Sequence, residues 1–226
     1  MLNELCLPVG MSRNDVVKLD ELIKERIRLP KGSALFHLGD RTEAVYAIRS
    51  GCIKTQLEDI TGQVQITGFL LPGEILGMDG LLNYEQTSHA IALEDSEVCV
   101  MLLDDMDRLS AHMPSLQQQF RRLMSKEINR SHRLVMSLGS LRSEQRLAAF
   151  LLNLSHRLSA LGYSSTDFIL RMSREEIGNY LGLTLETVSR LFSRFAREGL
   201  IRIQQREIKL LDYHALQVLS GTDCGD

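Results

Sequence analysis

The sequence has 226 residues, of which 44% are hydrophobic, and its formal net charge is −3. It contains no apolar run of about 18 residues and no charged, apolar and small-residue leader, which argues against a membrane span and a secretory signal. We therefore expect a cytoplasmic protein, with two domains as the better expectation for this length. The acidic balance argues against a chain coated in nucleic acid, so any DNA contact must come from a local patch.

The four cysteines are too few and too scattered for a disulfide scaffold, and no two of them form a Cys-x-x-Cys pair. We expect them to be thiols or ligands. They stand at Cys6, Cys52, Cys99 and Cys224.

The first structural region runs from about Ile27 to Leu103 and consists of short segments rich in Val, Ile, Leu and Phe. Glycines recur between the segments, as in strands that are joined by tight turns. The pattern predicts an antiparallel roll or barrel, which we assign to a first domain, residues 1–112. The recurring glycines are at positions 32, 39, 51, 62, 68, 73, 77 and 80.

A long helix is predicted next, because glycine is absent up to Leu138 while Gln, Arg, Lys, Met and Leu dominate. We assign residues 113–140 to it. Five of its residues are spaced alternately four and three apart, as in the seam of a two-stranded coiled coil, which indicates a homodimer. A helix packed on its own domain fits the same spacing. The seam residues are Met124, Ile128, Ser131, Val135 and Leu138.

Three further helices are predicted after this seam, the first from Ser143 to Leu161. Ser173 and Glu176 have the spacing of a capping box, so the second helix starts there, and it ends at Gly182. Thr184 can cap the third helix directly afterwards. Two short helices at so sharp a turn predict a helix-turn-helix.

The third of these helices has one apolar face and one face that can donate and accept hydrogen bonds. In a recognition helix Arg suits guanine and Glu suits cytosine. From Ser173 to Arg206 six arginines against four glutamates leave a local charge of +2. An ordinary ion pair of Glu186 with Arg190 on a solvated helix is the alternative. The apolar face has Val188, Leu191, Phe192 and Phe195, and the polar face has Glu186, Ser189, Arg190, Ser193 and Arg197.

The segment after Gly199 alternates apolar and polar residues on both sides of Gln205 and Arg206, which predicts a hairpin wing. Arg206 at its tip is expected to contact a phosphate, which adds affinity without sequence information. A hairpin that only completes the core fits the same residues. The hairpin belongs to the C-terminal domain, which we assign to residues 141–226.

Seven short motifs follow one another over nearly the whole chain. They are L-C-L-P at 5–8, Y-A-I-R-S-G at 46–51, Q-I-T-G-F at 65–69, A-L-E-D-S-E-V-C at 92–99, R-L-A-A-F at 146–150, I-G-N-Y-L-G-L at 177–183 and E-T-V-S-R at 186–190. The series resembles the cyclic-AMP receptor/FNR superfamily of bacterial transcription regulators, and within it the oxygen-sensing FNR branch.

This resemblance implies an α+β fold, with an N-terminal cyclic-nucleotide-binding-like β-roll (a jelly roll) as sensor domain, a long dimerisation helix and a C-terminal winged helix-turn-helix. It implies a homodimer on a palindromic operator in double-stranded DNA. It also implies contact with RNA polymerase, for which the turn from Asp59 to Gln63 is our candidate. Base contacts are expected from Glu186, Ser189 and Arg190, and DNA backbone contacts from Ser173, Thr184, Thr187 and Arg206.

A cyclic-nucleotide pocket needs a Gly-Glu turn and an arginine for the phosphate, because an anion in a closed pocket must be neutralised. Gly73 and Glu74 supply the turn, but Gln86 and Thr87 stand where the resemblance leads us to expect an Arg-Ser/Thr pair. Cyclic AMP is therefore not expected.

The oxygen-sensing branch holds a [4Fe-4S] cluster on four cysteine thiolates. Cys6 matches the third of them and Cys99 the fourth, while the other two fall just before Met1 by the family's spacing and are absent from this chain. Either the sequence begins at a downstream methionine or the cluster has been lost. Cys52, in a predicted strand, and Cys224, in the tail, are not expected to substitute. Cys99 can equally be a small buried core residue.

An enzyme is the rival class of protein. No P-loop, Rossmann fingerprint or nucleophile elbow is present, and the histidines show no metal-ligand spacing, so no enzyme is expected. A redox switch at the thiol of Cys6 or Cys99 stays open, because one thiol of low pKa would suffice, and so does a small-molecule signal. The histidines are His37, His89, His112, His132, His156 and His214.

Overall fold

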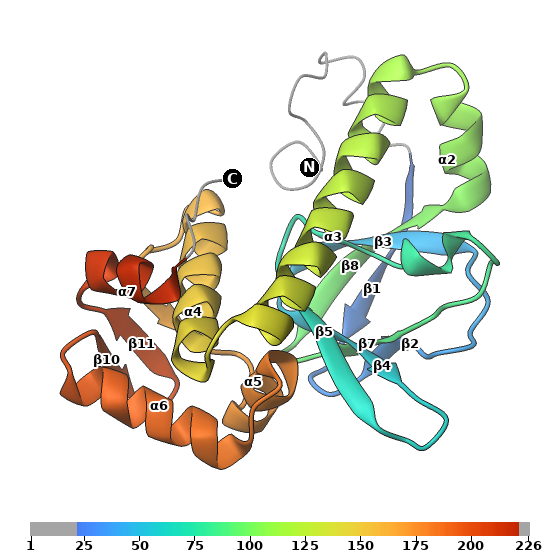
Figure 1. Cartoon of the computed structure of the whole chain (residues 1–226). Helices are drawn as coiled ribbons and strands as arrows, with labels where there is room; N and C mark the ends of the chain where they lie inside the picture. Colours follow the sequence, from blue (N-terminus) through green and yellow to red (C-terminus); the bar gives the residue numbers. More distant parts are fainter. Residues whose placement is uncertain (1–21, 222–226) are drawn as a thin grey trace. The chain divides into compact units, whose positions relative to one another are not determined.

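The computed structural model describes residues 22–221, and the chain divides into two compact units between Ser131 and His132. The division falls inside the predicted long helix, which is confirmed as α3 (Pro114–Ser140). Each unit is described by itself (Figure 1). Among the described residues, no helix combines the length and apolar character that crossing a membrane requires.

The first unit contains the predicted roll, built from two antiparallel sheets. One sheet has the strand order β1-β8-β3-β6 and the other β2-β7-β4-β5. The strands of the first are β1 (Ile23–Leu29), β3 (Ala44–Ser50), β6 (Ile75–Leu76) and β8 (Ser96–Leu102). Those of the second are β2 (Ala34–Phe36), β4 (Ile53–Glu58), β5 (Val64–Leu70) and β7 (His89–Ala92).

The two central strands of the first sheet, β3 and β8, contribute buried side chains to both faces, because successive side chains of a strand point to opposite sides. Val98 of β8 belongs to the cluster between the two sheets, together with Ile53. Cys99, the next residue, lies in the cluster on the other face, which includes Met106. Met106 comes from α2 (Leu103–Ser110), a helix that the sequence pattern did not predict.

Two details of the roll correct the sequence-based expectation. The strands begin at Ile23 rather than at Ile27, and Cys52 lies in the turn between β3 and β4 instead of in a strand. Gly51 causes the turn: its φ is +94°, and a Cβ there would lie 2.1 Å from Oγ of Ser96. Only glycine fits such a bend, which leaves the side chain of Cys52 fully buried.

The second unit contains the predicted helix-turn-helix and wing. A short strand pairs with the wing hairpin in the order β10-β11-β9, and this strand and the last helix were not predicted individually. The elements are α4 (Ser143–Ala160), β9 (Asp167–Ile169), α5 (Arg174–Leu181), α6 (Leu185–Arg197), β10 (Ile201–Gln204), β11 (Glu207–Leu210) and α7 (Tyr213–Ser220).

The wing hairpin has a buried face and an exposed tip. Ile201, Ile208 and Leu210 are buried and complete the core of the unit. Gln205 and Arg206 form the exposed turn, where Gln205 has a φ of +55°. The hairpin therefore packs on the unit with one face and presents its tip to solvent.

Candidate functional site

The start of α5, the turn after it and the start of α6 have the local features that the sequence predicted. Oγ of Ser173 accepts from the backbone N–H of Glu176 (3.1 Å), and the Glu176 carboxylate accepts from the N–H of Ser173 (2.7 Å). Gly182 ends α5 with a φ of +62°. Oγ1 of Thr184 then accepts from the N–H of Thr187 (3.2 Å) at the start of α6. The capping box, the left-handed turn and the second cap are all present.

Gly178 sets how closely α5 approaches this turn. A Cβ at this position would lie 2.7 Å from the carbonyl oxygen of Leu183, nearer than a Cβ approaches any atom in real structures. The oxygen belongs to the backbone and cannot move aside alone. A residue without a side chain is therefore required for the tight turn.

α6 is held by one face and exposes the other, as its sequence predicted. The inner face packs in the core, and the outer face carries polar side chains. The buried residues are Val188, Leu191, Phe192 and Phe195. The exposed residues are Glu186, Ser189, Arg190, Ser193 and Arg197.

The three expected base contacts, Glu186, Ser189 and Arg190, lie together on the exposed face in the first half of α6. Hydrogen bonds from its own backbone N–H and from the Thr184 hydroxyl lower the pKa of Glu186, so its carboxylate stays an ionised acceptor. Nη2 of Arg190 donates to Oγ1 of Thr187 (3.3 Å). Within the described part of the chain no ion pair within 4 Å joins Glu186 to Arg190, although the charge of Arg190 also lowers the pKa of Glu186.

The expected DNA backbone contacts lie at helix starts and at the wing tip. Ser173 and Thr184 cap α5 and α6, where backbone N–H groups and the helix dipole favour an anion. Thr187 is one turn into α6. Arg206 is exposed at the wing, where its Nη1 donates to the carbonyl of Arg171 (3.3 Å).

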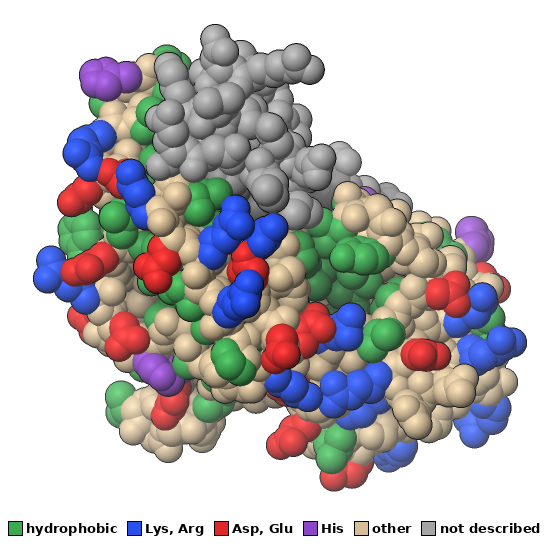
Figure 2. All heavy atoms as spheres, turned by 180° about the vertical axis from the view of Figure 1, so that it is seen from behind, with side chains coloured by type: hydrophobic (Ala, Val, Ile, Leu, Met, Phe, Trp, Pro, Cys, Tyr) green, Lys and Arg blue, Asp and Glu red, His purple; other side chains and the backbone are tan. Residues whose placement is uncertain are grey.

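Two of the arginines that contribute to the local charge of +2 make contacts within the second unit. Cζ of Arg174 lies 3.3 Å from the centroid of the Phe192 ring, and burial lowers the pKa of Arg174 to about 10. Arg194 donates to Glu144 (3.1 Å) and to Glu198 (2.7 Å). On the face seen in Figure 2, basic and acidic side chains are interspersed rather than gathered in one field. The contacts of Arg174 with Phe192 and of Arg194 with Glu144 join residues far apart in the sequence, so the sequence pattern could not reveal them.

The expected dimer seam lies on the exposed side of α3 for most of its length. Met124, Ile128 and Val135 are large exposed hydrophobic residues, and Ser131 between them is exposed. Leu138 is half-buried. Its Cδ2 would lie 3.1 Å from a Cβ placed on Gly182. Leu138 therefore contacts its own helix-turn-helix.

Of the two expected cluster ligands, Cys99 lies within the described residues and Cys6 lies outside them. Burial raises the pKa of the Cys99 thiol, and the nearby charges of Arg26 and Arg49 oppose this shift. Between residues 22 and 221 no group of three or more His, Cys, Asp or Glu side chains could hold a metal ion. The described residues contain two cysteines, Cys52 and Cys99, so by themselves they supply fewer than the four thiolates of a [4Fe-4S] cluster.

The connections around residues 73–88 contain the Gly-Glu turn and the Gln86-Thr87 pair that the sequence singled out. The hydroxyls of Thr87 and Ser88 donate to Oδ2 of Asp79 (2.8 and 2.7 Å). The Glu74 carboxylate accepts from the N–H of Leu71 (2.9 Å). The Asp79 carboxylate thus accepts hydrogen bonds from two hydroxyls next to Gln86, and the absence of cyclic AMP stays a prediction from the sequence.

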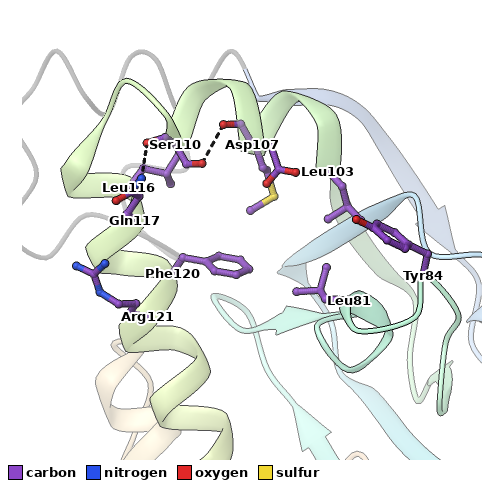
Figure 3. Close-up of a pocket in the computed structure, with 10 residues that line it drawn as sticks. Leu81, Tyr84, Leu103, Asp107, Ser110, Leu116, Gln117, Phe120 and Arg121 are labelled. Carbon is purple, nitrogen blue, oxygen red and sulfur yellow. Dashed lines mark hydrogen bonds between the residues drawn. The ribbon is translucent and has the colours of Figure 1, made fainter.

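A cavity of about 370 Å³ lies between α2, the start of α3 and the segment around Leu81. Apolar side chains form part of its lining, and Figure 3 shows the Phe120 ring of α3 pointing toward Leu81. Tyr84, Asp107 and Arg121 also line it. A small, mainly apolar molecule would fit such a space.

Comparison with known proteins gives the same picture over the whole chain. A Crp-like helix-turn-helix domain matches residues 145–219, and a cyclic nucleotide-binding domain matches residues 26–112. The chain is 65% identical to the transcriptional regulatory protein btr of Bordetella pertussis, over 99% of this chain and 92% of that protein. It is 44% identical to an anaerobic regulatory protein of Pasteurella multocida, over 98% and 81%. FixK2 from Bradyrhizobium japonicum, a solved structure, has a TM-score of 0.81 at 25% identity, covering 88% of this chain and 98% of that one.

A β-roll followed by a long helix and a winged helix-turn-helix defines a DNA-binding transcription regulator. The relatives that match nearly the full chain are regulators of this kind. The chain belongs to the cyclic-AMP receptor/FNR superfamily, which confirms the resemblance drawn from its motifs.

Proposed function

We propose that two copies of this chain bind a palindromic operator, each with α6 in the major groove, and that binding responds to oxygen or redox state. The observation that carries the proposal is the two-sided α6, because its buried face fixes the helix while its exposed face presents an acceptor and a donor to base edges. Selection of duplexes from a random pool tests the proposal. Recovery of a two-fold symmetric sequence supports it, and recovery of no preferred sequence contradicts it.

Arg190→Ala is expected to cost about 1–3 kcal/mol of binding free energy at the operator and to relax the preference at one base pair. The measurement is a set of titrations with the operator and its single-base variants at one salt concentration. Arg197→Ala is the control, since it removes an exposed cation from the far end of α6. An equal loss for Arg190→Ala on random DNA would refute the base-reading role.

The proposed dimer uses the exposed apolar stripe of α3, and Ser131 sets its strength. A small polar group in the middle of a coiled-coil seam weakens association and can leave the monomer–dimer balance near its switching point. Ser131→Leu is expected to tighten dimerisation about tenfold or more, measured by sedimentation equilibrium with and without oxygen. Asn129→Leu, at an exposed position outside the seam, is the control. An unchanged dimerisation constant under both conditions contradicts the idea.

The proposed response to oxygen is supported by the motifs of the FNR branch and by a 44% identical relative named an anaerobic regulatory protein. In this chain Cys6 and Cys99 are the proposed ligands. Iron and acid-labile sulfide per chain are measured on protein purified without oxygen, made once from Met1 and once with upstream codons restored. About four irons per chain in the longer form only would support a cluster sensor. Absence of iron from both forms would contradict it.

The alternative is the same DNA-binding regulator switched by a thiol or a small molecule, and the cavity beside Phe120 favours the latter. The lining of this cavity includes residues of α3, so a ligand there would contact the helix that is proposed to join the two copies. Melting of iron-free protein against a panel of small carboxylic acids tests this, because a ligand of the folded state raises the melting temperature. Phe120→Ala should abolish any such shift.

The turn from Asp59 to Gln63 is our proposed contact with RNA polymerase. The Asp59 carboxylate accepts hydrogen bonds from Thr61 and from the N–H of Gln63 (2.9 Å), which lower its pKa and order the turn. Ile60 is fully exposed at its tip. Ile60→Ser is expected to reduce transcription several-fold in a purified system, since it removes an apolar contact of about 1–2 kcal/mol. Operator affinity should not change, and a parallel loss of affinity would contradict this role.

A further inference from the structure

Arg146 of α4 donates to three backbone carbonyls that come from three different parts of the second unit. Its Nη2 donates to the carbonyl of Leu138 in the last turn of α3 (2.7 Å), and its Nε to that of Leu141 in the α3–α4 linker (2.9 Å). Its Nη1 donates to the carbonyl of Leu181, the last residue of α5 (2.9 Å). One guanidinium thus connects the end of α3, the linker and the helix-turn-helix.

The partners of this guanidinium are groups that need a donor. The last four carbonyls of a helix have no partner within the helix, and they carry the negative end of its dipole. Leu138 and Leu181 hold such positions in α3 and α5. Arg can serve both ends at once because its planar group presents five N–H donors in fixed directions, whereas a Lys ammonium is a point charge.

Side-chain packing supports the same junction. A Cβ at Gly182, the turn residue after Leu181, would lie 3.1 Å from Cδ2 of Leu138 and 3.3 Å from Nη1 of Arg146. The turn of the helix-turn-helix therefore packs directly on the end of α3 and on the guanidinium. The position of α5 relative to the end of α3 depends on these contacts.

We propose that Arg146 is a positioning residue that sets the separation of the two recognition helices in the dimer. The inference rests on the proposed function, in which α3 joins the two copies. In a dimer with its two-fold axis along α3, both copies have the same α3–α5 junction. The junction therefore sets the distance between the two recognition helices, and this distance sets the half-site spacing that fits. Weakening this junction should reduce the preference for one half-site spacing more than it reduces the affinity of one recognition helix for one half-site.

The test compares full-length variants on four duplexes: the selected operator, the same operator with one base pair inserted or deleted between its half-sites, and a single half-site. The variants are Arg146→Gln and Arg146→Lys. The control is Arg142→Gln, which removes an exposed cation from the same linker, where the backbone N–H rather than the side chain bonds to Gln145. Far-ultraviolet circular dichroism and melting temperature are recorded for each protein.

Both Arg146 variants are expected to bind the half-site within about threefold of the unchanged protein and to lose about tenfold or more of the preference for the native spacing. The control should keep that preference. Full spacing preference in either Arg146 variant overturns the positioning role, and for Arg146→Lys it would show that charge alone suffices. Loss of half-site binding together with lower melting in both variants overturns it as well, because Arg146 then serves folding only. If the unchanged protein itself binds operator and half-site equally, the proposed dimeric function fails, and the positioning role fails with it.

Discussion

Replacing Phe195 by alanine is expected to lower the free energy of unfolding of the second unit by about 3–5 kcal/mol. The Phe195 side chain is 0% exposed and lies on the inner face of α6. Truncating it removes buried apolar area and leaves a cavity in a core that cannot close over it completely. Since the inner face provides the apolar anchor of α6, the residues that are proposed to contact bases lose support at the same time.

Amide hydrogen exchange measures this effect locally. Protection of the amides of α4 and α6 should fall by about two to three orders of magnitude in Phe195→Ala, while the strands of the roll keep theirs. Val218→Ala is the matched control, because Val218 belongs to the same unit and is 69% exposed on α7. Its effect should stay within about 0.5 kcal/mol. Equal effects of the two substitutions would show that α6 is not anchored as described.

The second large effect on stability and operator affinity is expected for Gly178→Ala. In the middle of a helix, alanine is normally better than glycine by about 1 kcal/mol. At Gly178 the added Cβ would lie 2.7 Å from the carbonyl oxygen of Leu183, so α5 and the turn must separate. We expect a net loss of about 1–3 kcal/mol in unfolding free energy and a clear loss of operator affinity.

Gly139→Ala provides the comparison within the same chain. Gly139 is also helical, in α3, but nothing lies within 4 Å of a Cβ placed there. The expected outcome is a gain of up to about 1 kcal/mol with operator affinity unchanged. Urea unfolding followed by circular dichroism, together with operator titration, distinguishes the effects of the two substitutions. If Gly178→Ala is as harmless as Gly139→Ala, the close approach of α5 to the turn is not essential.

The fold and the recognition helix could be predicted from the sequence because their signals are local. The capping box of Ser173 and Glu176 spans three residues, and the left-handed turn needs only Gly182. The two faces of α6 follow from a helical repeat that any chain segment displays in its own sequence. The ordered motifs then placed this local pattern in a family, so the roll, the long helix and the wing could be expected together.

Tertiary contacts decided which side chains are available for DNA and which hold the unit together. Arg146 bonds to Leu181, 35 residues away, and Arg194 to Glu144, 50 residues away. Periodicity gives the face on which an arginine lies, but it contains no information about a partner so distant in the chain. Two short elements were missed for a related reason. α2 has one buried residue, Met106, and β9 is a strand because β11 pairs with it. The sequence by itself therefore determined the class of fold and the exposed polar face of α6, whereas contacts between distant segments determined how that face is supported.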